Sequence, residues 1–180
     1  MSKSKKYKID LFTGEGVDDL LNAIEEKQRW LDRKTQELVD KLTDYGVVVA
    51  NAGFESAIYD GTNDFYVGFE HRGDQHKAVI ATGTTVLFVE FGTGVTYPDN
   101  HPEAGKNGMV RGSFGKGYGK YPTWGYYGEP GSHGQEHVKR DGSTVILTHG
   151  NPANMPMYNS VKALEQDFRA MALEVFTSDD

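Results

Sequence analysis

Two histidines and a glutamate are spaced in a pattern that can bind zinc. His133, Glu136 and His137 match H-x-x-E-H, the motif of the inverted zinc peptidases. That chemistry needs both histidines on one face of a helix and a third ligand from elsewhere in the chain. Pro130 and Gly134 stand around the motif, and its flanks lack helical periodicity. We therefore expect no functional metal and no cofactor, and a zinc-dependent hydrolase stays as one alternative.

A single carboxylate, Glu90, interrupts an apolar run of the chain. A carboxylate in a buried element can serve in catalysis, but such a residue more often faces solvent or pairs with a basic side chain. No acid or base stands at an informative spacing from it, so we expect a structural role. The glycine-rich stretches lack phosphate-binding spacing, and no G-x-S-x-G motif is present. The sequence therefore predicts no catalytic residue and a protein that is not an enzyme.

Glycine and tyrosine concentrate in residues 92–142, here called the arm. The arm holds 13 of the 22 glycines and five of the ten tyrosines, and this aromatic content is unusual for a disordered linker. It indicates an inserted arm or lobe with a function of its own. Rigid aromatic side chains are typical of interface cores, and the candidates are Tyr118, Tyr121, Trp124, Tyr126 and Tyr127. A monomeric module that captures a peptide or a glycan on these tyrosines is a second alternative.

The composition is that of an acidic, cysteine-free chain. Its 180 residues include 19 Lys and Arg against 26 Asp and Glu, a formal net charge of −7. Such a chain is a poor candidate for binding nucleic acid through its phosphates. The absence of cysteine excludes disulfides, cysteine-based zinc sites and cysteine nucleophiles. With no signal peptide and no apolar run long enough to span a membrane, we expect a soluble protein made in the cytoplasm.

Hydrophobic periodicity predicts the elements that position these residues. Residues 17–45 have the three- and four-residue steps of one long amphipathic helix, which Gly46 would end. Short apolar, β-branched or aromatic runs predict strands, at Gly46–Ala50, Phe65–Phe69, Ala78–Ala81, Thr84–Phe91 and Ser143–Thr148. Thr84–Phe91 is expected to be the strongest strand, buried on both faces.

A second amphipathic helix is predicted at the end of the chain. Pro156 suits its first turn and Asn154 is a candidate cap. Leu164 and Phe168 lie on its apolar face and are expected to be buried in a core with the first helix and the strongest strand. The order of elements predicts a single α+β domain over residues 1–180. In it, a mostly antiparallel sheet is packed by the two helices, and the arm is an insertion.

Two motifs together resemble a family of phage proteins. The strongest apolar run ends in E-F-G-T-G at residues 90–94, and a P-A-x-x-P-M turn at residues 152–157 leads into the last helix. This pair is similar to that of tail-component proteins of long-tailed double-stranded DNA phages, also called tail-completion or head–tail connector (neck) proteins. The residues expected at assembly interfaces are the five aromatic residues above with Glu90, Phe91, Gly92, Thr93, Gly94, Pro152 and Pro156.

The resemblance implies a structural protein of the virion, in its neck or tail. Its members form a homo-oligomeric ring, which implies a hexamer here because the tail tube of such phages is six-fold. The implied neighbours are the portal-side connector and the tail-tube or tail-terminator proteins. DNA would pass through the lumen without specific binding, and acidic walls suit such a channel because they do not hold phosphates. No membrane is implied.

Overall fold

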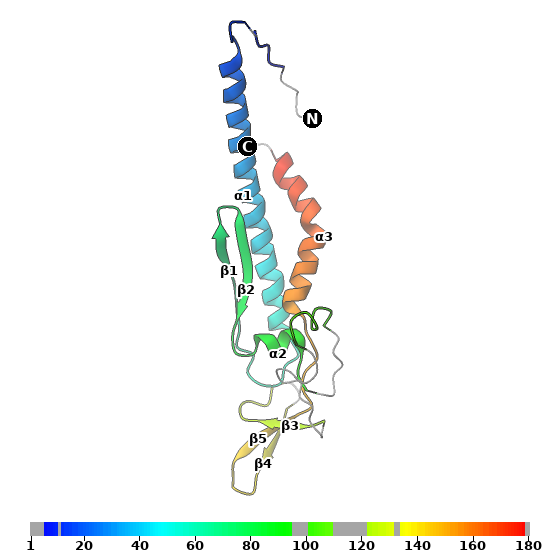
Figure 1. The fold of residues 1–180 in the computed structure, drawn as a ribbon. Helices are drawn as coiled ribbons and strands as arrows, with labels where there is room; N and C mark the ends of the chain where they lie inside the picture. Colours follow the sequence, from blue (N-terminus) through cyan, green and yellow to red (C-terminus); the bar gives the residue numbers. More distant parts are fainter. Residues whose placement is uncertain (1–5, 11, 95–100, 110–121, 132–133, 179–180) are drawn as a thin grey trace.

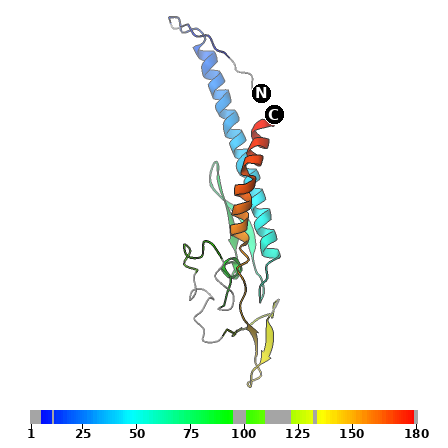
Figure 2. The ribbon, with the colours of Figure 1, turned by 90° about the vertical axis from the view of Figure 1, so that its right-hand side faces the viewer.

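The molecule is built on one long helix, against which a second helix and a β-hairpin pack (Figure 1). The computed structural model describes residues 6–10, 12–94, 101–109, 122–131 and 134–178. Within them the order is α1 (Val17–Glu55), β1 (Tyr66–Gly73), β2 (His76–Thr82), α2 (Val86–Phe91), β3 (Trp124–Tyr126), β4 (Gln135–Val138), β5 (Thr144–Thr148) and α3 (Pro156–Thr177). α1 and α3 lie side by side and run in opposite directions in both views (Figures 1 and 2). The predicted α+β class is confirmed.

The strands form two antiparallel sheets. β1 and β2 make a hairpin against α1, and the other sheet has the order β3-β5-β4. Three of the predicted strands are confirmed, because Phe65–Phe69 overlaps β1, Ala78–Ala81 lies in β2 and Ser143–Thr148 contains β5. β3 and β4 come from the arm and flank β5 on both sides. This part of the arm is therefore attached to the rest of the chain through β5.

α1 does not end at Gly46, and no strand follows it at Gly46–Ala50. The helix continues to Glu55, because Ala50 and Phe54 are fully buried against β1 and α2 in the core. A Cβ on Gly46 would lie 3.1 Å from Val79 Cγ2 and 3.2 Å from Leu164 Cδ1. The glycine therefore lets the helix approach its neighbours closely, and it is not a terminator. Both predictions made from it are wrong.

Gly53 of α1 lies directly against Pro156, the first residue of α3. A Cβ there would lie 2.8 Å from Pro156 Cβ and 3.0 Å from Pro156 Cα. Gly53→Ala would gain about 1 kcal/mol of helix propensity, but overpacking against a rigid ring costs about 1–3 kcal/mol. We expect a net loss of stability of about 1 kcal/mol, measured by urea denaturation. Gly105→Ala is the control, because a Cβ at Gly105 meets nothing within 4 Å. Equal or higher stability of Gly53→Ala would contradict this packing.

The run predicted as the strongest strand, Thr84–Phe91, is instead the short helix α2. The carboxylate of Asp64 accepts hydrogen bonds from the hydroxyl and the backbone N–H of Thr84 and from the N–H of Thr85. It thereby satisfies donors at the start of the helix. These hydrogen bonds, the one from the Thr84 hydroxyl first, hold the pKa of Asp64 below its usual range.

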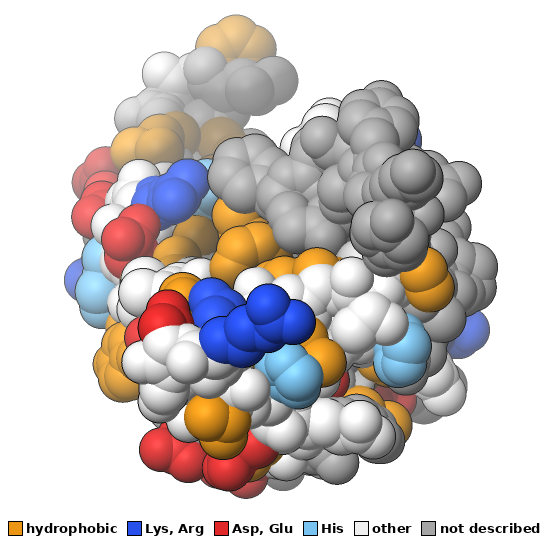
Figure 3. All heavy atoms as spheres, turned by 90° about the horizontal axis from the view of Figure 1, so that it is seen from below, with side chains coloured by type: hydrophobic (Ala, Val, Ile, Leu, Met, Phe, Trp, Pro, Cys, Tyr) orange, Lys and Arg blue, Asp and Glu red, His pale blue; other side chains and the backbone are white. Residues whose placement is uncertain are grey.

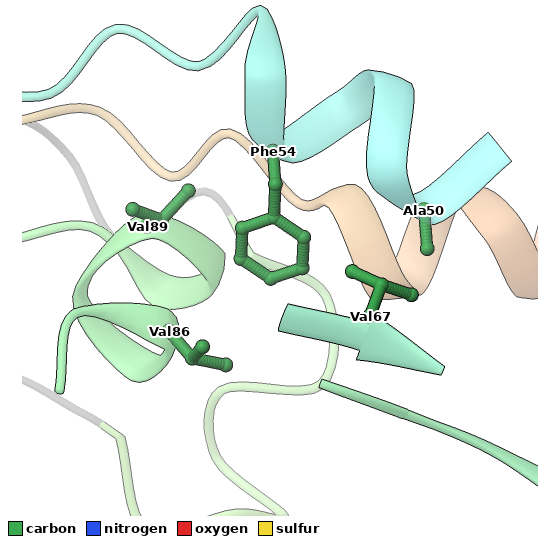
Figure 4. Close-up of a cluster of buried hydrophobic side chains, with 5 residues drawn as sticks. All are labelled: Ala50, Phe54, Val67, Val86 and Val89. Atoms are coloured by element: carbon green, nitrogen blue, oxygen red, sulfur yellow. The ribbon is translucent and has the colours of Figure 1, made fainter. Parts of the chain in front are cut away.

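The core lies where α1, β1 and α2 meet (Figure 4). Its buried members are Ala50, Phe54, Val67, Val86 and Val89. The rings of Phe54 and Phe65 stack with their centroids 5.1 Å apart. α3 adds the partly buried Met157, so this core differs from the predicted one, in which both helices enclose a strand.

α3 packs on α1 with part of the predicted face. Ser160 is buried, and its hydroxyl donates to the Gly46 carbonyl of α1 at 2.8 Å. Leu164 is half-buried and Val175 is buried, whereas Phe168 is 51% exposed, so the predicted burial of Phe168 is wrong.

Candidate functional site

The two motifs that carry the resemblance lie against each other. They form what we call the motif junction, residues 90–94 with residues 149–157. A Cβ on Gly92 would lie 2.7 Å from Ala153 N and 2.8 Å from Asn151 O. Gly92 also has φ 76° and ψ 171°, a backbone conformation that is essentially restricted to glycine. The sequence therefore needs glycine here for two independent reasons, its backbone conformation and the contact between the segments.

The same close contact continues along the junction. A Cβ on Gly150 would lie 2.3 Å from Thr93 O, and one on Gly94 would lie 2.5 Å from His149 O. The Thr93 N–H donates to Asn151 O at 2.9 Å, and the Asn151 N–H donates to Thr93 Oγ1 at 2.9 Å. Thr93 and Asn151 are both buried. The junction is thus a backbone-to-backbone contact with its polar groups paired inside the protein.

Two asparagines tie the junction to the segment that follows α1. The Asp60 N–H donates to Asn151 Oδ1 at 2.6 Å. Asn154 pairs with the backbone of Ile58, accepting from its N–H at 2.9 Å and donating to its carbonyl at 3.0 Å. Asn154 is therefore not the helix cap that the sequence suggested. The cap position is Met155, with φ 59° and no side-chain hydrogen bond.

Glu90 caps α3 from a distant part of the chain. Its carboxylate is buried and accepts from the backbone N–H of Met157 at 2.8 Å and of Tyr158 at 3.0 Å. The first N–H groups of a helix have no partner inside it, and a carboxylate there is favoured by the helix dipole. Pro156 is the first residue of α3, as predicted. Glu90 thus has the structural role expected of it.

His101 completes the environment of Glu90. The two side chains are buried, and His101 Nε2 lies 2.9 Å from Glu90 Oε1. The N–H of Glu103 donates to His101 Nδ1 at 3.0 Å, so the ring proton is on Nε2 and points at the carboxylate. The ring packs against Phe91 and Tyr158, with centroid distances of 4.3 and 5.4 Å. Sequence reasoning did not identify His101, because no local pattern links it to Glu90.

Three of the predicted interface aromatics line one pocket. Trp124, Tyr126 and Tyr127 surround a pocket of about 470 Å³ that also borders the motif junction. Trp124 is 40% and Tyr127 70% exposed. Figure 3 views the molecule from this end, where hydrophobic side chains lie at the surface among polar ones. Tyr118 and Tyr121 lie outside the described residues.

Acidic groups accompany these rings. Asp60 lines the pocket and is buried, and its Oδ2 accepts a hydrogen bond from the hydroxyl of Thr148. Burial raises the pKa of Tyr126 to about 12, with smaller contributions from the nearby Asp60 and Tyr59. The Tyr126 hydroxyl donates to the carbonyl of Glu129 at 2.7 Å. The pocket therefore combines exposed aromatic surface with negative charge, which suits contact with apolar or basic side chains.

The predicted zinc motif does not have the helical arrangement that it requires. Glu136 and His137 are consecutive residues of strand β4, where neighbouring side chains point to opposite faces. His133 lies outside the described residues. Over the part of the chain that the structure describes, no three potential metal ligands of the His, Cys, Asp or Glu types gather together.

Comparisons with known proteins add no relative. A scan against protein-family models and searches of curated proteins and of solved structures returned no match. None of the described helices has the length and apolar character needed to cross a membrane.

Proposed function

We propose that this chain is a structural protein of a long-tailed double-stranded DNA phage that completes the neck or tail of the virion. The observation that supports this best is the motif junction. E-F-G-T-G and P-A-x-x-P-M are the two segments that resemble the phage family, and in this fold they form one buried contact. The backbones of the two motifs are in contact, so the motifs must fit each other. A matching pair of motifs therefore indicates the local structure shared with that family more strongly than either motif does alone.

The junction has a mechanical consequence for the arm. The chain leaves the helices and the β1–β2 hairpin at Gly94 and returns through β5 to His149. Gly94 and His149 are in contact. An insertion whose ends are held together can vary in its outer part without disturbing the body of the protein. Its aromatic pocket then lies next to this fixed base, where a partner protein can contact it. This arrangement suits a protein that joins others.

The proposal includes the assembly implied by the resemblance. The chain forms a homo-oligomeric ring, a hexamer by the six-fold symmetry of the tail tube, and contacts connector and tail-tube or tail-terminator proteins. A cyclic ring uses heterologous interfaces, in which one patch meets a different patch of the next subunit. The protein is not an enzyme and uses no cofactor. Its net charge of −7 is compatible with DNA passing through the lumen.

A second candidate function is a monomeric module that binds a peptide or a glycan. The aromatic pocket of about 470 Å³ favours it, because exposed Trp and Tyr beside carboxylates can bind either ligand. The two candidates differ in assembly, since a module works as a monomer and a neck protein works in a ring. No contact among the described residues favours the zinc hydrolase.

The test is complementation of the parent phage from which the gene has been deleted. We expect the deletion to leave heads and tails unjoined, or tails malformed, in electron micrographs, and the wild-type gene to restore plaques. The Trp124→Ser/Tyr127→Ser variant should fold but fail to restore them, because both side chains are exposed in the isolated chain. Tyr66→Ser is the matched control, since Tyr66 is a 66% exposed aromatic residue on β1.

The outcomes separate the two parts of the proposal. Normal virions from the deleted phage would overturn the proposed function itself. Full complementation by the Trp124→Ser/Tyr127→Ser variant would overturn the role of the aromatic pocket and leave the neck function standing. Circular dichroism melting of both variants establishes that they are folded.

A further inference from the structure

The N-terminal part of α1 carries apolar side chains that no described element covers. Figures 1 and 2 show this part of the helix extending beyond the end of α3 and the tip of the β1–β2 hairpin. Trp30, which packs edge-on against Phe176 near the end of α3, marks where the cover stops. Beyond it, Leu21 and Ile24 are 52% and 53% exposed, and Leu31 beside it is 48% exposed.

These residues belong to one regular stripe along α1. Its members are separated alternately by four and three residues, the spacing of a coiled-coil seam: Val17, Leu21, Ile24, Gln28, Leu31, Thr35, Leu38, Leu42 and Tyr45. In the C-terminal part the stripe is covered, since Leu38 is buried and the Tyr45 hydroxyl donates to Asp167 of α3. The N-terminal part continues the same pattern without a partner helix.

The charges beside the stripe differ on its two sides. On one side Lys27 directly precedes a stripe position, and on the other side Asp18, Glu25 and Asp32 directly follow stripe positions. Lys34 also precedes a stripe position, but it is buried and donates to Ser178 of its own chain. In two parallel helices the Lys27 side of one helix faces the acidic side of the other helix, so opposite charges meet. In two antiparallel helices the acidic side of one helix faces the acidic side of the other, so like charges would meet. The charge pattern therefore favours a parallel partner with the same sequence.

We propose that the stripe from Val17 to Leu31 packs against the same stripe of a second copy of this chain, with the two α1 helices parallel. Such a contact would bury apolar surface that each isolated chain exposes. Rotation about an axis along the helices keeps them parallel for any number of copies. In a ring of such helices the stripes face the common axis, and the Lys27 side of each copy meets the acidic side of the next, so the contact between neighbours is heterologous. The contact therefore rests on the ring of the proposed function and names the surface through which neighbouring subunits meet.

Cysteine cross-linking tests the contact directly, because the natural chain has no cysteine. Leu21→Cys places one thiol in the stripe, and Glu26→Cys places one on the opposite side of the same helix. Parallel packing brings equal residue numbers together, so mild oxidation should link Leu21→Cys chains into disulfide dimers. Glu26→Cys chains, whose thiol is also exposed, should stay largely unlinked. Both positions are exposed, so neither change disturbs the fold.

Charge reversal tests the orientation. Lys27→Glu sets acid against acid across the parallel contact and should lower the association constant about fivefold, since two symmetry-related pairs are affected. In the triple variant Lys27→Glu/Glu25→Lys/Asp32→Lys the charges on the two sides of the stripe are reversed. Opposite charges then meet again across the contact, and association should be restored. Sedimentation velocity over a range of protein concentrations measures these constants.

The apolar part of the contact has its own variant. Ile24→Asp puts a charge into the stripe of both copies and should lower association more than tenfold. Wild-type assembly that Ile24→Asp leaves intact would overturn this inference, as would a purely monomeric wild type with no Leu21→Cys dimer. A cross-link only between Leu21→Cys and Leu31→Cys chains would show antiparallel packing and overturn it as well.

The proposed function can fail separately. A stripe that cross-links as expected, together with normal virions from the deleted phage, would keep the contact and remove the neck function. A loss of head–tail joining, together with an intact ring in the Ile24→Asp variant, would keep the neck function and place the ring interface elsewhere.

Discussion

Replacing Gly92 by alanine should lower the free energy of unfolding by about 3 kcal/mol. The backbone at Gly92 has φ 76° and ψ 171°, where any side chain is strained by about 1–3 kcal/mol. In addition, the new Cβ would lie 2.7 Å from Ala153 N and 2.8 Å from Asn151 O. Both neighbours are backbone atoms, so neither can move aside as a side-chain tip could. The two motifs would have to separate.

Gly142→Ala separates the two causes. Gly142 also has a positive φ, +84°, but a Cβ there meets nothing within 4 Å. Gly142→Ala should therefore lower the free energy of unfolding by only the conformational cost, about 1–2 kcal/mol. Urea denaturation of both variants gives the difference, which contains the contact between the motifs together with the additional strain that ψ 171° causes at Gly92. Equal losses in the two variants would mean that the motifs do not depend on their close approach.

The sequence predicted the elements whose pattern is regular over many residues. The long helix and the final helix have such patterns, and both are present. The short runs are ambiguous: those of β1, β2 and β5 are strands, as predicted, but Thr84–Phe91 is not. Thr84–Phe91 failed because an apolar run this short fits a strand and a buried helix equally well. The helix is favoured by Asp64, which lies far from it in the sequence and satisfies the N–H groups of Thr84 and Thr85. A pattern within the run contains no information about that partner.

The prediction from Gly46 failed for a related reason. A glycine after an apolar stripe is commonly the end of a helix, but here it lies where α3 and β2 leave no room for a side chain. Tertiary contact overrides the local rule. On α3 the periodicity likewise included Phe168, which is 51% exposed.

Part of the site could be found from the sequence, and part could not. The motif residues were identified through their resemblance to a family, but nothing local indicated that Gly92 and Gly150 face each other's segments. Trp124, Tyr126 and Tyr127 were identified by composition and do gather around one pocket. His101 was missed, since its role depends on a contact with Glu90 that only the folded chain creates.

The second large effect is expected at Glu90. Glu90→Leu removes the acceptor for two N–H groups of α3 and for the Nε2 proton of His101. Hydrogen bonds to a charged group contribute about 1.5–3 kcal/mol each, and buried donors without a partner add to the loss. We expect the free energy of unfolding to fall by about 4 kcal/mol, a large share of the stability of an ordinary domain. Thermal and urea unfolding, followed by circular dichroism, measure it.

Glu90→Gln distinguishes capping from simple packing, because it keeps the shape of the side chain. In the wild type, Oε1 accepts from the Tyr158 N–H and from His101 Nε2, and Oε2 accepts from the Met157 N–H. The amide NH₂ of glutamine therefore faces an N–H donor in either orientation, and at the Oε1 position it faces both Tyr158 and His101. His101 can turn its proton to Nδ1 only by losing the hydrogen bond from Glu103. We expect a loss of about 2 kcal/mol. Glu165→Gln, on the exposed side of α3, should change stability by about 0.5 kcal/mol at most.

A double-mutant cycle with His101→Phe measures the coupling between Glu90 and His101. Phenylalanine keeps an aromatic ring against Phe91 and Tyr158 but has no proton to direct at residue 90. Glu90→Gln should therefore cost less in the His101→Phe chain than in the wild type, with a coupling energy of about 1 kcal/mol or more. A coupling near zero would show that His101 does not hold the carboxylate. If Glu90→Gln itself is neutral, the carboxylate does not fix the start of α3, and the junction must position that helix through its backbone contacts alone.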